Sequence, residues 1–121
     1  MPATATRERP RHQSVRIERR GAERHPCCLR AFCCPLADGF DLSWLGVVVD
    51  ISTTGISLLS TRRFEPSAFI SVELQEKSQP APRRLLVGVV HARLMPSGKG
   101  WVIGCDFIRE LSAQELQAIL S

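Results

Sequence analysis

The segment from Asp50 to Gly55 has the pattern Asp-x-Ser-x-x-Gly and combines three groups that can act on a polar ligand. The Asp50 carboxylate can accept hydrogen bonds from a base edge, and the Ser52 hydroxyl can both donate and accept. Gly55 has no Cβ, so the backbone there can turn sharply or approach a ligand closely. Asp and Ser side chains also cap hairpin turns through local bonds, and this is the competing structural interpretation.

Arginines upstream of this segment supply the complementary charge. A guanidinium group stays charged at physiological pH, and its planar fork matches phosphate oxygens and the O6 and N7 acceptors of guanine. A spacing of four residues, which lets two such groups reach one ligand, occurs at Arg7 with Arg11, Arg16 with Arg20, and Arg20 with Arg24. We prefer Arg20 with Arg24, because a pair beside the folded body loses less chain entropy when it becomes ordered. Arg16 with Arg20 stays the alternative.

The net charge of +4 is concentrated at the start of the chain. Residues 1–24 contain seven arginines and three glutamates, and the rest of the chain has equal numbers of basic and acidic residues. Such a segment is suited to an anionic partner. Its composition is also typical of a poorly ordered tail, so we expect residues 1–18 to form a flexible basic leader and residues 19–121 to form a single domain.

Chain composition restricts the location and the chemistry. No apolar run approaches the roughly 18 residues of a membrane span, and no apolar export region follows the first arginines. Five cysteines, an odd number, fit a reducing compartment, so we expect a cytoplasmic protein. The histidines are scattered and Ser52 lacks a Gly-x-Ser-x-Gly context, so no enzyme is predicted. The strand-like segments show no exposed aromatic platform for stacked bases, which argues against a nucleic-acid partner.

Two cysteine pairs, Cys27-Cys28 and Cys33-Cys34, raise the question of a zinc site. On one straight strand the members that share a face would lie roughly 20 Å apart, which is too far for one metal ion. We therefore predict no metal site. These four cysteines and Cys105 are expected to be small core side chains.

Apolar and β-branched segments separated by turn residues predict six strands and one helix. Gly88 is expected to mark a bend or bulge. Ser112 and Glu115 form a capping-box pattern, and the apolar residues after it share one helical face. The expected strands are residues 27–34, 44–49, 56–59, 69–74, 85–94 and 101–108. Closely spaced strands of this kind favour a mainly β fold, a six-stranded antiparallel barrel with a short C-terminal α-helix packed on it.

The order of these motifs resembles the PilZ domain family, the bacterial receptor module for cyclic di-GMP, over about residues 19–120. The likeness rests on Arg19-Arg20-x-x-x-Arg24-His25-Pro26, on the Asp50 to Gly55 turn with its flanking strands, and on the closing strand at residues 102–107.

This resemblance implies that cyclic di-GMP is held between the arginine segment and the turn. Asp50 would accept from guanine N1 or N2, Ser52 would bond a base or a phosphate, and Gly55 would keep the turn open. Arg19 would add a guanidinium that could stack on a purine and favour a stacked ligand pair. The expected ligand-binding residues are Arg19, Arg20, Arg24, Asp50, Ser52 and Gly55.

The implied function is a receptor or adaptor that passes the messenger signal to an unidentified protein through ordering of its arginine segment. Two alternatives stay open: a divergent PilZ-like adaptor that works only through protein contacts, and a basic module that binds polyanions without specificity. The sequence leaves open the ligand stoichiometry, the oligomeric state and the downstream effector.

Overall fold

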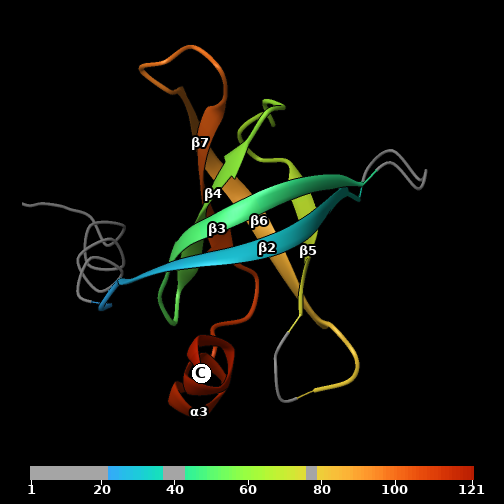
Figure 1. The fold of residues 1–121 in the computed structure, drawn as a ribbon, viewed down its shortest axis with the longest axis vertical. Helices are drawn as coiled ribbons and strands as arrows, with labels where there is room; N and C mark the ends of the chain where they lie inside the picture. The colour runs from blue at the N-terminus through green and yellow to red at the C-terminus, as the bar shows by residue number, and fades with distance from the viewer. Residues whose placement is uncertain (1–21, 37–42, 76–78) are drawn as a thin grey trace, which may run out of the picture.

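The computed structural model describes residues 22–36, 43–75 and 79–121. Its elements are β2 (His25–Pro35), β3 (Trp44–Ile51), β4 (Gly55–Ser60), β5 (Phe69–Leu74), β6 (Arg83–Leu94), β7 (Trp101–Phe107) and α3 (Ala113–Leu120). The strands pair antiparallel in the order β2-β3-β4-β7-β6-β5 and close into a barrel (Figure 1). The predicted mainly β fold with six strands and a C-terminal helix is confirmed. The predicted leader and its boundary at residue 18 lie outside the described residues.

The barrel core follows from the two-residue period of its strands, because successive side chains point to opposite faces. Ile56 and Leu58 of β4 are fully buried, as are Ile70 and Val72 of β5. Ile103 of β7 lies directly across from Leu58 in the neighbouring strand, and its exposed fraction is also zero. Residues between these positions face outward, so the outer face of the strands is available for ligands and partners.

The predicted irregularity at Gly88 is wrong. Gly88 pairs in register with Phe69 on β5 and with Asp106 on β7. The pairing of β6 with β7 shifts instead between Val89 and His91. A glycine permits a bulge but does not create one, since the position of a bulge depends on how two strands match each other across the sheet.

Helix α3 begins with the predicted capping box. The Ser112 hydroxyl accepts from the Glu115 backbone N–H, and the Glu115 carboxylate accepts from the Ser112 backbone N–H. Leu116 and Ile119 turn toward the barrel and are buried. Figure 1 shows α3 at one end of the barrel, with the β6–β7 hairpin at the opposite end. Among the described residues, no helix combines the length and apolar character that crossing a membrane requires.

Two predictions about surface residues need correction. Cys33 and Cys105 are buried as expected, but Cys28 is exposed, because alternation along β2 turns its side chain outward. The described residues contain no group of three or more His, Cys, Asp or Glu side chains placed to hold a metal ion. Two aromatic rings on the strands are exposed, Phe32 at 56% and Phe69 at 54%, so the expected absence of an aromatic platform is not supported by burial of these rings. Both rings lie on the outer face of the barrel.

Candidate ligand site

Arg24 and Asp50 are brought together by the pairing of β2 with β3. His25 lies opposite Ile51 and Pro26 lies opposite Asp50, so the residue that precedes β2 crosses the end of β3. The Arg24 guanidinium donates through Nη1 to Asp50 Oδ1 at 2.6 Å. Half of the Arg24 side chain and 30% of the Asp50 side chain stay exposed. A cation and a hydrogen-bond acceptor from two separate motifs therefore share one accessible position.

Two register shifts lie beside Asp50. Between Pro26 and Leu29, two residues of β2 face one residue of β3, and a second shift occurs between Val48 and Asp50 in the pairing of β3 with β4. Bulges of this kind bend a strand and redirect its side chains. Cys27 lies at the first bulge, and its thiol donates to the Val48 carbonyl at 3.6 Å. Burial and then the nearby Asp50 carboxylate raise the Cys27 pKa, so this thiol stays neutral.

Ser52 holds the turn together from inside. Its Oγ accepts from the backbone N–H of Thr54 at 3.1 Å and from that of Gly55 at 3.2 Å, and it lies 3.1 Å from the Thr54 hydroxyl. The Ser52 backbone N–H donates to the Gly55 carbonyl at 2.9 Å. The side chain is fully buried. These are the local hydrogen bonds expected if Ser52 acts as a turn-capping residue. Ser52 therefore fixes the shape of the turn that carries Asp50.

Gly55 is required by the neighbouring strand. A Cβ at this position would lie 2.2 Å from the Cys105 carbonyl oxygen of β7. No side chain fits at that separation. The glycine therefore allows β4 to leave the turn in close contact with β7, which fixes the turn relative to the barrel.

The end of β7 and the segment between β7 and α3 are hydrogen-bonded to the same turn. Phe107 N–H donates to the Thr54 carbonyl at 2.8 Å, and Leu111 N–H donates to the Thr53 carbonyl at 2.9 Å. Beside this contact lies a groove of about 300 Å³, which β2, the turn and α3 form together. The groove is lined by Glu23, His25, Thr53, Ala113, Leu116, Gln117 and Leu120.

The structure thus brings together Arg24, Asp50, Ser52 and Gly55, whereas Arg19 and Arg20 lie outside the described residues. Sequence reasoning missed the groove residues of α3. They lie some 60 residues beyond the turn along the chain, and only the packing of the helix onto the barrel end brings them near it. Their helical spacing predicted burial against the strands and carried no sign of a shared groove.

A family model described as the PilZ domain matches residues 18–121. The chain belongs to the PilZ domain family. The match covers both motifs and the whole barrel, and it includes Arg19 and Arg20. None of the curated proteins compared with this PilZ domain matches it.

Two solved structures share the fold. The Bacillus subtilis inhibitor of motility, MotI/DgrA, superposes with a TM-score of 0.61 at 16% identity, over 82% of this chain and 46% of that protein. The PilZ domain of YcgR from Escherichia coli, solved with c-di-GMP, superposes with a TM-score of 0.56 at 16% identity, over 83% of this chain and 86% of that one. This chain therefore spans less than half of the Bacillus protein.

Proposed function

We propose that this PilZ domain is a receptor for cyclic di-GMP, bound between the arginine segment before β2 and the turn from Asp50 to Gly55. The observation that carries the proposal is the contact of Arg24 with Asp50, which joins the two motifs at one exposed position. The ligand has phosphate anions for the guanidinium groups and guanine edges for Asp50. The c-di-GMP in the YcgR PilZ domain supports the choice of ligand.

In the proposed complex each residue has a separate part. Arg24, with Arg19 and Arg20, contacts phosphate or guanine, while Asp50 accepts from guanine N1 or N2. Ser52 contributes through the turn that its Oγ holds, and Gly55 lets that turn sit against β7. Arg24 must exchange some of its contact with Asp50 for the ligand. Because that ion pair is partly exposed, breaking it costs only about 0–1 kcal/mol.

The first prediction is saturable binding of cyclic di-GMP in a calorimetric titration. Arg24→Ala should weaken it by about 1.5–3 kcal/mol, which is roughly ten- to hundredfold, because a charge-assisted contact is lost. Asp50→Ala should weaken it less. The matched control is Arg93→Ala, which removes the same charge from an exposed position near the far end of β6 and should leave the affinity unchanged.

The same titration with ATP separates the alternatives. Equal affinity for ATP and cyclic di-GMP, with a steep dependence on salt, would identify a polyanion binder. Absence of binding would favour a divergent adaptor, in which the ion pair of Arg24 with Asp50 is purely structural. The fitted stoichiometry distinguishes one ligand from a stacked pair.

Signal transfer is the second part of the proposal. Ligand binding orders the arginine segment over the barrel and so changes the surface that a partner protein meets. Hydrogen exchange of residues 19–24 should slow when cyclic di-GMP is added. Unchanged protection, in a sample whose binding is confirmed by calorimetry, rejects the ordering step without rejecting the receptor.

A further inference from the structure

A single row of residues runs across the outer face of the barrel from the candidate ligand site to β6. Asp50 of β3 pairs with Ser57 of β4, and Ser57 pairs with Gly104 of β7. Gly104 pairs in turn with His91 of β6. We call these four residues the outer row. Neighbouring strands lie about 4.8 Å apart, so Gly104 is roughly 10 Å from Asp50 across the sheet.

His91 faces outward because of a bulge. Leu85, Val87 and Val89 are buried at alternate positions of β6, and strict alternation would turn the next such position inward as well. The register shift between Val89 and His91 adds one residue, and Val90 and His91 are both exposed as a result. Bulges of this kind redirect a side chain and are frequent next to binding sites.

Gly104 makes room for the imidazole ring of His91. A Cβ at Gly104 would lie 2.2 Å from His91 Cε1 and within 2.9 Å of both ring nitrogens. The ring therefore occupies the space that a side chain at Gly104 would need, next to the backbone of β7. Gly104 is buried, whereas His91 is exposed. The outer row thus ends in an aromatic ring that the glycine holds close to the sheet.

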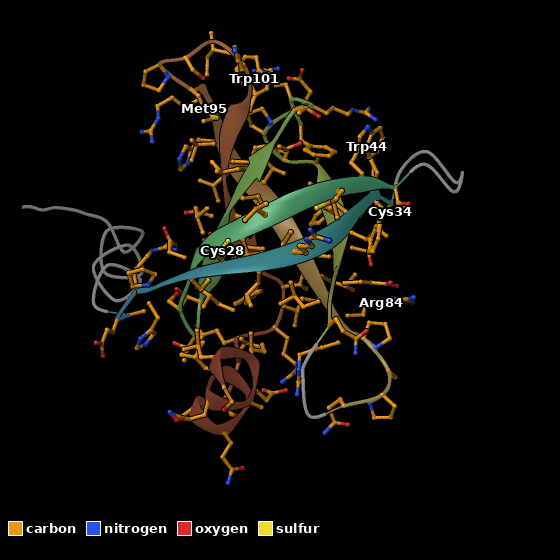
Figure 2. All side chains as sticks on the ribbon, viewed as in Figure 1. Cys28, Cys34, Trp44, Arg84, Met95 and Trp101 are labelled. Carbon is orange, nitrogen blue, oxygen red and sulfur yellow. The ribbon has the colours of Figure 1, made fainter. Side chains whose placement is uncertain are left out.

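The outer row is left open between the two ends of the barrel. In Figure 2, Met95 and Trp101 mark the β6–β7 hairpin at one end, and α3 lies at the other. His91 precedes Met95 by four residues and lies between these ends. Within the described part of the chain, neither the Ser57 hydroxyl nor the His91 imidazole has a hydrogen-bond or ion-pair partner. Both groups are therefore available to a ligand.

We propose that the outer row is the second half of the ligand site, in which a base of the bound cyclic dinucleotide packs against the His91 imidazole. This inference rests on the proposed receptor function. A cyclic dinucleotide has two bases, so one can lie at Arg24 and Asp50 while the other reaches across β4 to β7. Aromatic side chains, histidine included, support nucleobases by stacking, and the Ser57 hydroxyl between the two positions can donate or accept.

Calorimetric titration of the full chain with cyclic di-GMP tests this proposal. His91→Ala should weaken binding by about tenfold, because the stacking of a base on an aromatic side chain is lost. His91→Phe keeps an aromatic ring at this position and should recover most of that loss. His91 is exposed, so circular dichroism should show an intact fold in both variants.

The matched control is Val90→Ala. Val90 is 50% exposed and is the extra residue of the same bulge, so this variant should bind like the wild type. Equal losses in Val90→Ala and His91→Ala would overturn the proposal, because the bulge and not the ring would then support binding. Affinity as low in His91→Phe as in His91→Ala would also overturn it. Arg93 lies opposite Val102, outside the outer row.

Arg24→Ala separates this proposal from the receptor function. Binding that Arg24→Ala weakens and His91→Ala leaves unchanged would overturn the role of the outer row and keep the receptor. Absence of wild-type binding would reject the receptor function and the outer row with it. A direct readout is the NMR signal of the His91 ring protons, assigned by their loss in His91→Ala, which should shift when cyclic di-GMP is added.

Discussion

Arg24 and Asp50 form a charged pair at the candidate ligand site. Each side chain neutralises the other while both stay in contact with water. A partly exposed pair of this kind contributes little to stability, so its presence is explained better by positioning than by folding energy. The pair keeps the guanidinium extended across the end of β3, in the place where the proposed ligand would need it.

Gly55 couples the turn to the barrel, and this coupling is testable. Gly55→Ala should lower the free energy of unfolding by about 1–3 kcal/mol, because its Cβ would overlap the Cys105 carbonyl. Gly88→Ala is the matched control: its Cβ would meet the Phe69 ring at 3.6 Å, an ordinary contact, and the unfolding free energy should stay within about 1 kcal/mol of the wild type. Urea unfolding measures both. Equal losses of unfolding free energy in the two variants would contradict the role of Gly55 in the close contact with β7.

At the scale of elements, the first turn of α3 carries a carboxylate that links the helix to the chain segment before it. The Glu115 side chain accepts from the Arg109 guanidinium at 2.9 Å and from the Ser112 N–H at 2.8 Å. The hydrogen bond from Arg109, and then that from the Ser112 backbone, lower the Glu115 pKa from 4.5 to about 2. The stabilisation is complete above the ordinary pKa and is lost as the pH falls through about 2.

The prediction concerns Glu115→Gln, which keeps a side-chain oxygen for the cap but removes the charge. The variant should be less stable than the wild type at neutral pH, and the difference should shrink below pH 4.5 and vanish near pH 2. Unfolding by denaturant at several pH values measures it. Glu110→Gln, a change of an exposed carboxylate in the same segment, is the control. A difference between Glu115→Gln and wild type that does not vary with pH would show that the charge has no such role.

The elements themselves were largely predictable because each has a local signal. Alternation marked β5 at its observed bounds, and the Ser112 capping box marked the helix start. The wrong predictions concern features that depend on how strands pair and pack in the barrel. The bulge near Val89 depends on the register with β7, and the exposure of Cys28 depends on which face of β2 turns inward.

At the scale of the whole molecule, barrel closure separates the cysteines into accessible and protected thiols. Burial raises the pKa of Cys33 to about 11 and, with smaller effects of Cys33 and Asp106, that of Cys105 to about 12. A thiol reagent at mildly alkaline pH should therefore modify Cys28 rapidly and these two only after unfolding, because the thiolate is the reactive form. Peptide mass spectrometry measures the order. Early labelling of Cys105 would contradict a closed barrel.

In the candidate site too, some residues could be recognised from sequence motifs, whereas other surface features depend on the fold. The turn residues and the arginine spacing carried recognisable chemistry, so Arg24, Asp50, Ser52 and Gly55 were named from the sequence alone. The exposed apolar side chains of the strands had no such signal. Phe32, Phe69 and Leu86 each read locally as an ordinary strand residue, and their outward direction is decided only by the fold.

Closure of the barrel has a last consequence for recognition. Every described strand has a hydrogen-bonded neighbour on both sides, since the order that starts at β2 returns to it through β5. Strand addition by another polypeptide is therefore confined to stretches such as residues 25–30 of β2, which pair with β3 alone. Where both neighbouring strands are present, an associating molecule must contact side chains, so single substitutions there can abolish an association without opening the sheet.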